Sequence, residues 1–474
     1  MKRTNGHYAL LFVLLGGLVG CASVPREAGF PDVRQNVTDR IGYQVQWYRG
    51  APEEAEVAEA IRSQLRDALT VDEAVQIALL NNRWLQAIYE DLGVAQADVV
   101  QAGLLHNPIF GGDATFPTSG GIPDLFFSVV TNFLDIFYIP LRKAVANAAF
   151  EGAKLQVTGA AMDLSGQTRA AFYRVQADGQ LLEMLQQVVL ATEATYEAAR
   201  RMHEAGNIRN LDLHNEQALY EQARLDLEAA EALMVEGRER LNSLMGLWGA
   251  DTKWTLANRL PDIPEQQMDL SDLEKRAITT SLDLGIAKQE IETFGQLLGL
   301  TQSTALVPAL DLGASAERED GGWKIGPAAA LALPIFDQGQ ARIATVQAEL
   351  RRRQAKYLAV AVEVRSVVRV IRQRLITARR IAEHYQNVTL PLRSLITEES
   401  QLHYNAMQIG IFQLLLAKRQ EIQAGRNYIQ ALHAYWVARS DLDLLLQGRH
   451  SNLSKFSQVE TQMPVPLMVS TRGE

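Results

Sequence analysis

This sequence of 474 residues has little or none of three features: cysteine, the common enzyme motifs and long apolar runs. Each of these gaps excludes a class of protein. The only cysteine is Cys21, so the chain cannot form an internal disulfide bond. The patterns Gly-x-Ser-x-Gly, His-Glu-x-x-His and Cys-x-x-Cys do not occur. Carboxylates such as Glu221, Glu228 and Glu231 are typical of a solvated helix face rather than of acid–base pairs. We therefore predict that the protein is not an enzyme, with no catalytic residue and no cofactor.

Positive charge is also in short supply, with 46 Lys and Arg against 55 Asp and Glu and a formal net charge of −9. Lys2 and Arg3 are the only such residues before Cys21, so removal of residues 1–20 would change the charge from −9 to −11. A nucleic-acid partner requires a basic face, so we predict none.

Residues 1–20 have the pattern of a bacterial signal peptide: two basic residues precede an apolar stretch that is too short to span a bilayer. The stretch ends in Leu18-Val19-Gly20-Cys21, the form of a lipobox, in which the cysteine becomes the acylated N-terminus. The alternative is an ordinary secretory signal with a stray cysteine. Because Ala22 rather than aspartate follows, we predict that Cys21 carries lipid and anchors the chain in the outer membrane.

Proline is absent from residue 141 to residue 205, where Ala, Gln, Glu, Leu and Arg dominate. A helix of that length would be on the order of 100 Å long. Lys154 and Asp163 lie along it and exclude a membrane span. A turn at 206–210 and a return helix to residue 246 follow. Such a rod needs a partner that packs along its length.

The pattern of the first half recurs roughly 200 residues later, which indicates an internal duplication. Before each long helix, alternating apolar and polar residues predict a β-hairpin, at about 108–139 and about 305–336. Capping boxes at Thr70–Glu73 and Ser271–Glu274 predict helix starts. The predicted organisation begins with a tether over 21–68 that contains one short helix at 55–68. A first repeat follows over 69–264, with long helices at about 141–246. A second repeat covers 265–447, with long helices at about 340–446, and a flexible tail covers 448–474.

Two prolines are predicted to bound these elements. Pro140 should end the first hairpin and precede the long helix. Pro391 lies inside the second long stretch, where it removes a helical hydrogen bond, so we predict a break or a restart there. Aromatic residues near the first hairpin are predicted to form the girdles of a membrane barrel, namely Phe126, Phe127, Phe133, Phe137 and Tyr138.

Two hairpins supply four strands with one apolar and one polar face, and four strands cannot close a barrel alone. A lipid-facing sheet cannot keep an open edge, because unsatisfied backbone groups in hydrocarbon cost several kcal/mol each. The strands could instead form a soluble sheet packed on the helices. The lipobox and the alternation favour copies that pool their strands, and three copies would give twelve.

Four stretches carry a family resemblance: Leu69-Thr70-Val71-Asp72-Glu73-Ala74-Val75 with Asn81-Asn82, Gln101-Ala102-Gly103-Leu104-Leu105-His106-Asn107-Pro108, Ile335-Phe336-Asp337-Gln338-Gly339, and Leu390-Pro391. In this order they resemble the TolC family of bacterial outer-membrane efflux proteins, in its lipoprotein branch that serves resistance-nodulation-division pumps. The match covers about residues 69–446. The resemblance implies a mainly α, duplicated protomer with two β-hairpins. It also implies a homotrimer with a twelve-stranded transmembrane β-barrel that is continued by a long periplasmic α-helical barrel.

The resemblance further implies a passive exit duct that conducts small toxic compounds or metal ions across the outer membrane. A periplasmic adaptor (membrane fusion) protein, an inner-membrane pump and outer-membrane lipid are the implied partners. One alternative is the duct of an ABC-driven type I protein secretion system, and another is a lipid-anchored coiled-coil scaffold without a pore. The transported compound does not follow from the sequence, because selectivity mostly belongs to the pump.

The resemblance places the periplasmic tip and gate at the interhelical turns 206–212 and 404–413, with Gly206, Asp212, Tyr404, Gln413 and Leu414 as gate residues. Asp212 matches an aspartate that can pair across the closed tip, and Tyr404 matches an aromatic position. However, Ile409 replaces the pairing arginine, and Gln413 and Leu416 replace the constriction aspartates. We therefore predict a looser closure by Gln413, Leu414 and apolar packing, opened by an iris-like rotation of the return helices.

His203, His214 and His403 flank the two turns. Imidazole is a good ligand for Zn or Cu, so a closed trimer could bring these residues together around a metal. The alternative is surface histidines at helix ends. We predict no metal site and keep these three residues as candidates.

Overall fold

The structure is a computed structural model that describes residues 23–450, apart from residues 117, 119–121, 257–258, 267 and 320–321. Cys21, the predicted signal peptide and residues 451–474 lie outside the described residues, so the predictions for them stay predictions. The chain forms two compact units. The sheet unit comprises the described parts of Met1–Asp32, Tyr89–Val157 and Gly285–Leu358, and the helical unit comprises those of Val33–Ile88, Thr158–Leu284 and Ala359–Glu474.

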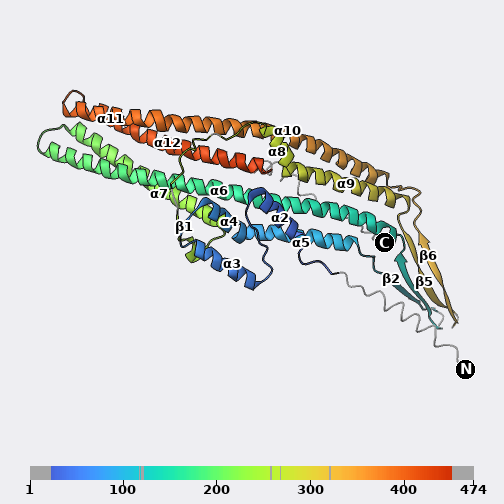
Figure 1. The fold of residues 1–474 in the computed structure, drawn as a ribbon. Helices are drawn as coiled ribbons and strands as arrows, with labels where there is room; N and C mark the ends of the chain where they lie inside the picture. Colours follow the sequence, from blue (N-terminus) through green and yellow to red (C-terminus); the bar gives the residue numbers. More distant parts are fainter. Residues whose placement is uncertain are drawn as a thin grey trace. The chain divides into compact units, whose positions relative to one another are not determined.

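Helices of very unequal length make up most of the described chain (Figure 1). They are α2 (Phe30–Ile41), α3 (Ala51–Gln64), α4 (Val71–Asn81), α5 (Arg83–Ala102), α6 (Asp135–Glu204), α7 (Asn210–Met245), α8 (Leu273–Thr280), α9 (Leu282–Leu306), α10 (Gln340–His384), α11 (Leu390–Asn405) and α12 (Ile411–Leu446). Helix α6 has 70 residues, which confirms the predicted rod of roughly 100 Å.

The predicted tether contains two helices, α2 and α3, rather than one at 55–68. Phe30, Val33 and Val37 are buried and stand at helical spacing, a signal that the surrounding prolines and glycines obscure in the sequence. Helix α3 begins early because Pro52 fits the first turn of a helix, where no backbone donor is lost.

One of the two predicted capping boxes is confirmed. At the start of α4, the Thr70 hydroxyl accepts a hydrogen bond from the Glu73 N–H (3.3 Å), and the Glu73 carboxylate accepts one from the Thr70 N–H (2.9 Å). The box at Ser271–Glu274 is wrong. The Ser271 N–H donates to the Asp269 carboxylate, and Asp272 takes a left-handed backbone at φ +49°, so α8 starts without a side-chain cap.

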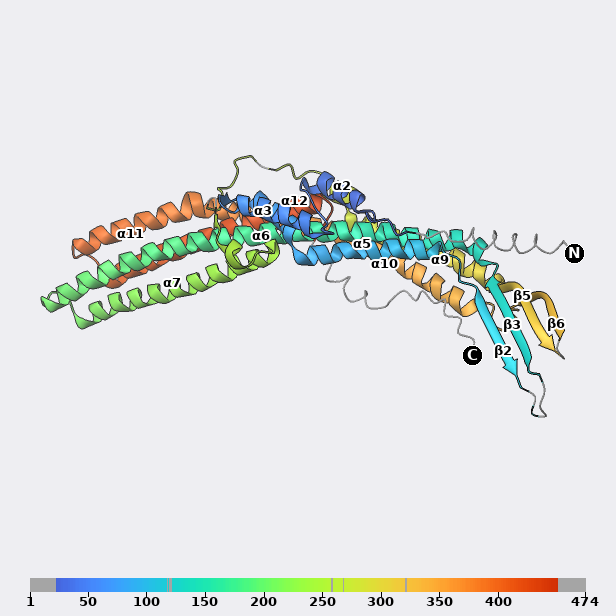
Figure 2. The same cartoon turned by 90° about the horizontal axis from the view of Figure 1, so that it is seen from below.

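The four strands of the two hairpins form one antiparallel sheet in the sheet unit (Figure 2). They are β2 (Ile109–Thr115), β3 (Asp124–Asn132), β5 (Leu310–Glu319) and β6 (Gly322–Leu331), in the order β2-β3-β5-β6. Both predicted hairpins are confirmed, and β3 pairs with β5 to join them. A Cβ atom at Gly313 would lie 1.9 Å from the Val129 carbonyl oxygen, so only glycine fits where these two strands meet.

The element boundaries beside the strands differ from the prediction. Helix α6 begins at Asp135, so Pro140 lies within its second turn instead of before the helix. The proline is tolerated there because its fixed φ suits a helix and only one hydrogen bond, next to the unpaired first turn, is lost. The Tyr138 hydroxyl donates to the Val307 carbonyl at 2.7 Å, which ties this early start to the end of α9.

The second hairpin also starts later along the chain than predicted. Helix α9 continues to Leu306, so β5 starts at Leu310 and not at residue 305. At the other end of the hairpin, Arg318 pairs with Trp323 and Glu319 pairs with Gly322.

The predicted break in the second long stretch is confirmed. A π-helical turn (Tyr385–Thr389) follows α10, and α11 restarts the helix with Pro391 in its first turn.

Helices α8, α10 and α12 enclose a core of the helical unit. Its buried members are Leu273, Ala277, Val364, Val368, Ile371, Leu375, Tyr435, Ala438, Leu442 and Leu445. Between α7 and α8, the described residues include a short 3-10 helix (Gly249–Thr252) and a strand, β4 (Thr255–Leu256), which pairs in parallel with β1 (Ala68–Leu69).

Candidate functional site: the two turns, the helix ends and the sheet

The two interhelical turns of the helical unit have the same backbone construction. After α6, Gly206 is left-handed at φ +78°, and the Asn207 N–H donates to the Met202 carbonyl at 2.8 Å. After α11, Met407 is left-handed at φ +58°, and the Gln408 N–H donates to the His403 carbonyl at 2.9 Å. Both are Schellman motifs, which supply donors to the last carbonyls of a helix.

Each return helix begins with a side chain that folds back onto its own turn. Asp212 accepts from the Arg209 side chain, with 3.1 Å between Nε and the carboxylate. Gln413 accepts from the Gly410 N–H at 2.9 Å. Sequence reasoning placed both residues at the gate and did not find Arg209. The signal for it is local: an arginine stands three residues before the aspartate.

Two predicted gate residues are held inside the chain. Burial raises the pKa of the Tyr404 hydroxyl, and the nearby charges of Glu216 and Asp212 raise it further, so Tyr404 faces the start of α7. Leu414 is only 2% exposed and packs within the protomer. The structure therefore brings Tyr404 close to Asp212, whereas Gln413 is engaged with its own helix start. The gating role itself stays a prediction.

The histidines of the turns do not gather around a common point. Among the described residues, no group of three or more His, Cys, Asp or Glu side chains lies close enough together to hold a metal ion. His214 is exposed, and the Nδ1 atom of His403 contacts the Oε1 atom of Gln408.

The far ends of the two return helices share a backbone geometry but differ in chemistry. Helix α7 ends at Gly246, which is left-handed at φ +68°. The Asn81 amide donates to the Gly246 carbonyl at 2.8 Å, and the buried Asn82 amide donates to the Leu244 carbonyl at 2.9 Å. Neutral amides from α4 and its C-cap therefore cap this helix, and they explain the paired asparagines that sequence analysis singled out.

Helix α12 ends at Leu446, and Gly448, which follows its C-cap, is also left-handed at φ +106°. A charged group caps this helix. The Arg40 guanidinium donates to the Gln447 carbonyl at 2.8 Å. Arg449 forms a bidentate pair with Asp163 of α6, at 2.6 and 2.9 Å, and a second pair with Asp283 of α9. The three side chains are largely buried.

This ion cluster holds more carboxylates than cations. Burial raises the pKa of the Asp283 carboxyl to about 6, although the Arg449 charge opposes the shift. For Arg449, burial lowers the pKa, but the hydrogen bonds and charges of Asp163 and Asp283 outweigh it, so the net direction is upward. We therefore expect the end of α12 to respond to pH through Asp283, whereas the amides that cap α7 do not titrate in this range.

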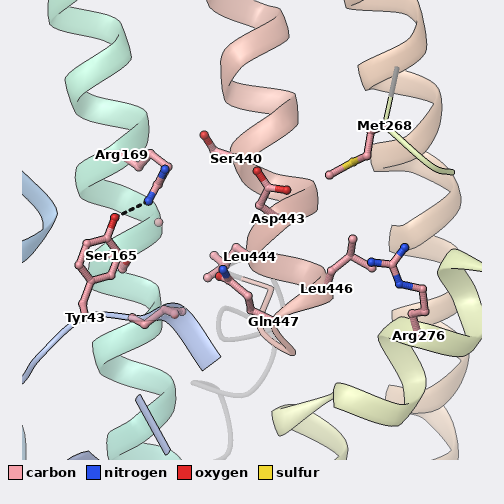
Figure 3. Close-up of a pocket in the computed structure, with 12 residues that line it drawn as sticks. Tyr43, Ser165, Arg169, Met268, Arg276, Ser440, Asp443, Leu444, Leu446 and Gln447 are labelled. Carbon is pink, nitrogen blue, oxygen red and sulfur yellow. Dashed lines mark hydrogen bonds between the residues drawn. The ribbon is translucent and has the colours of Figure 1, made fainter. Parts of the chain in front are cut away.

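A groove of about 390 Å³ opens in the helical unit between α6, α8 and α12 (Figure 3). Arg169 donates to the Tyr43 hydroxyl at 2.7 Å, and that hydroxyl donates to Asp72 at 2.6 Å. Burial, followed by the hydrogen bond to Asp72, raises the pKa of Tyr43 to about 12. On the other wall, Asp443 is paired with Arg439 at 3.1 Å. The contacts of Tyr43 with Arg169 and Asp72 hold the N-terminal segment against α6 and α4, which is a structural role.

The sheet presents an apolar face that the chain itself does not cover. Phe110, Phe127 and Trp323 lie on it and stack in sequence, with ring centroids 6.1 and 6.2 Å apart. All three are exposed, as is Ile325 on the same face. The opposite face carries Asp113, Ser128, Glu317 and Lys324, in agreement with the predicted alternation.

The aromatic residues predicted for a girdle do not share one face of the sheet. Phe127 lies on the apolar face, but Phe126 pairs with Asp113 and Glu317 on the polar face. Phe137 and Tyr138 lie in α6 and not in a strand. The early start of this helix is the reason, since a strand alternates its side chains only as far as it extends.

The described chain combines a four-stranded sheet that has an exposed apolar face with two pairs of long helices. No helix in the part of the chain that the structure describes has an apolar stretch long enough to cross a bilayer. Residues 74–247 match the family model described as outer membrane efflux protein. The chain is similar to this family over those residues.

Individual proteins are similar to most of this chain. The cobalt-zinc-cadmium resistance protein CzcC of Cupriavidus metallidurans is 25% identical over 399 residues, which are 80% of this chain and 90% of that protein. A membrane protein from Pseudomonas aeruginosa has the same fold, with a TM-score of 0.67, 17% identity, and coverage of 81% of this chain and 95% of that one. The CmeC outer membrane channel of Campylobacter jejuni gives a TM-score of 0.65 and 14% identity, covering 83% of this chain and 89% of that one.

Proposed function

We propose that three copies of this chain form the exit duct of a tripartite efflux pump and conduct its cargo passively to the exterior. The observation that carries the proposal is the four-stranded sheet. Its apolar face is exposed, and no described strand pairs with the outer edges of β2 and β6. Because an open edge in hydrocarbon is costly, the sheets of several copies must close on one another. Three copies supply three times four strands, an even number of the kind found in membrane barrels.

The proposed partners are a periplasmic adaptor, which docks at the turns, and an inner-membrane pump, which supplies the energy. Exposed apolar side chains at the turns support docking there, namely Leu211 and Phe412. Lipid attached to Cys21 would anchor the chain in the same membrane as the barrel. The duct itself is proposed to have no catalytic activity and no resident cofactor.

The gate is proposed at the two turns, with Gly206, Asp212, Tyr404, Gln413 and Leu414. Asp212 is already bound to Arg209 of its own turn, which supports a closure that depends on packing rather than on a salt bridge between copies. Single-channel conductance of wild type and Asp212→Ala tests this role. An unchanged open probability would remove Asp212 from the gate.

Metal cations are proposed as the cargo. The relative CzcC is named for resistance to cobalt, zinc and cadmium, and it matches most of this chain. A deletion strain profiled against metal salts and drugs tests the cargo. Sensitivity to metals alone supports the proposal, sensitivity to drugs alone contradicts it, and a defect in protein export alone indicates a secretion duct.

Recording in planar lipid bilayers tests the duct itself. We expect discrete conductance steps from the wild-type protein. Phe127→Asp places a charge on the apolar face and should abolish channels, because charge on the lipid side of a barrel is destabilising. Ser128→Asp, one residue away on the polar face, is the matched control and should conduct. Absence of any wild-type conductance would indicate a scaffold without a pore.

A further inference from the structure

The second turn carries a backbone conformation that its residue does not favour. Met407 is left-handed at φ +58°, a region where a Cβ atom is crowded and glycine is the usual residue. The first turn has glycine at the corresponding position, Gly206. The Met407 side chain gains nothing from packing, since 94% of its surface is exposed. A strained residue without compensating contacts points to a function of its side chain.

A second unusual feature lies in the same turn. In a Schellman motif, the residue three positions before the cap and the residue after the left-handed position frequently make an apolar contact. Here these residues are His403 and Gln408, and the His403 Nδ1 atom contacts the Gln408 Oε1 atom. An amide oxygen can only accept, so the imidazole carries its proton on Nδ1. Its Nε2 atom keeps a lone pair, and no partner for it is found among the described residues.

We infer that His403 and Met407, which emerge from one closed turn, form a binding site for a soft d-block cation of the Cu(I) type. The ligands are the Nε2 atom of His403 and the thioether of Met407. Thioethers select soft cations, and imidazole suits copper and related metals. A carbonyl oxygen that fixes the tautomer of a ligating histidine is the usual arrangement around protein-bound metals, and the Gln408 amide supplies it here.

The first turn adds the same two residue types. Met202 is 42% exposed and precedes His203, and both lie in the last turn of α6. The inference rests on the proposed duct, in which the turns of three copies surround the periplasmic mouth. A site with few ligands per copy holds a cation loosely enough to release it, which suits a cation in transit rather than a structural metal.

Titration of the full-length protein in detergent with Ag(I), a redox-inert probe for Cu(I), tests the site. Met407→Leu is the decisive variant, because it keeps the apolar bulk and the strained backbone but removes the sulfur. We expect Ag(I) to bind the wild type at least about tenfold more tightly than Met407→Leu or His403→Gln. Gln408→Ala should weaken binding less than either, since it removes the tautomer lock and not a ligand. Mg(II) should not bind at this turn.

Other methionines and histidines can bind Ag(I), so the titration needs a methionine control away from the turns. Met268 packs against the core of the helical unit, and Met268→Leu should leave the Ag(I) affinity unchanged. Met202→Leu measures the contribution of the first turn. Equal Ag(I) affinity of wild type and Met407→Leu would overturn the inference.

Bilayer conductance in potassium salt separates the two proposals. If the wild type conducts and the Ag(I) affinities of wild type and Met407→Leu are equal, only the metal site fails. If the wild type does not conduct, the duct fails. If Met407→Gly reduces metal resistance in cells and Met407→Leu does not, the Met407 side chain serves apolar docking, and this outcome would contradict the metal site.

Discussion

The two halves of the chain share a backbone plan and differ in chemistry at corresponding places. A left-handed glycine follows both return helices, but neutral amides cap the first helix and the Arg40 guanidinium caps the second. Both turns close with the same pair of hydrogen bonds, but glycine occupies the left-handed position in one and methionine in the other. The long helix is continuous as α6 in the first half and interrupted before α11 in the second.

This comparison separates what the architecture requires from what it leaves open. A helix that ends in a compact turn needs donors for its last carbonyls and a left-handed residue to leave its axis, and both halves provide them. The group that completes the cap is not determined by the backbone. The second half uses charge and strain at places where the first half uses amides and glycine, and the two halves should therefore respond differently to substitution and to pH.

The largest expected difference concerns the ends of the return helices. Arg449→Ala leaves the buried carboxylates of Asp163 and Asp283 without their counter-charge. Loss of one partner of a buried ion cluster costs about 3–5 kcal/mol of unfolding free energy. Urea unfolding in detergent at pH 7 measures it. Adding Asp283→Asn should restore part of the loss. A loss below about 1 kcal/mol would show that this ion cluster contributes no more than one neutral hydrogen bond.

The second prediction uses pH to distinguish the same two helix ends. Burial raises the pKa of Asp283 to about 6, above its unfolded value, despite the opposing charge of Arg449. The fold therefore favours the protonated carboxyl. Its contribution to stability is full below about pH 4 and is lost as the pH rises through about 6, with an upper magnitude of about 3 kcal/mol.

Other carboxylates also titrate, so the measured quantity is the difference between wild type and Asp283→Asn. This difference should grow in favour of Asp283→Asn between about pH 4 and about pH 6 and stay constant above that. His450 lies in the same cluster, and its pKa is lowered chiefly by burial. A difference that does not change with pH would mean that Arg449 fully balances Asp283.

Sequence patterns predicted those elements that are determined by residues close together in the chain. The absence of proline indicated α6, the alternation indicated both faces of the sheet, and Pro391 indicated the helix restart, because each depends on neighbouring residues. The missed features depend on distant ones. Arg449 and Asp163 are 286 residues apart, and no periodicity relates them.

At the two interhelical turns, some features were likewise predicted and others were missed. Position along the chain identified both turns, since turn residues follow directly from the ends of helical periodicity. The partners of Asp212 and Gln413 were not identified, because both fold back onto their own turn instead of reaching across it. The left-handed backbone of Met407 was not predictable either, since methionine carries no preference for it.

The third prediction concerns the amide-capped end of α7. The Asn82 side chain accepts from the Leu85 N–H and donates to the Leu244 carbonyl, both at 2.9 Å, while only 5% exposed. Asn82→Ala removes both bonds and should cost about 2 kcal/mol of unfolding free energy. Asn82→Ser keeps a cap for α5 and isolates the lost amide donor. Unlike the loss in Arg449→Ala, this loss should be the same at about pH 5 and about pH 7, because an amide does not titrate there.

The smallest expected effect compares the turns themselves, where the two halves should respond with opposite signs. Met407→Gly relieves a left-handed backbone and removes a side chain that contributes no packing, so it should stabilise the protein by up to about 1 kcal/mol. The greater freedom of glycine in the unfolded chain reduces the gain. Gly206→Ala places a Cβ atom in the same conformation in the first turn and should destabilise by about 1 kcal/mol, although nothing lies within 4 Å of the added atom. Thermal unfolding of both variants measures the signs. If Met407→Gly is destabilising, the exposed methionine has a structural partner. Its left-handed backbone would then no longer indicate a ligand-binding role.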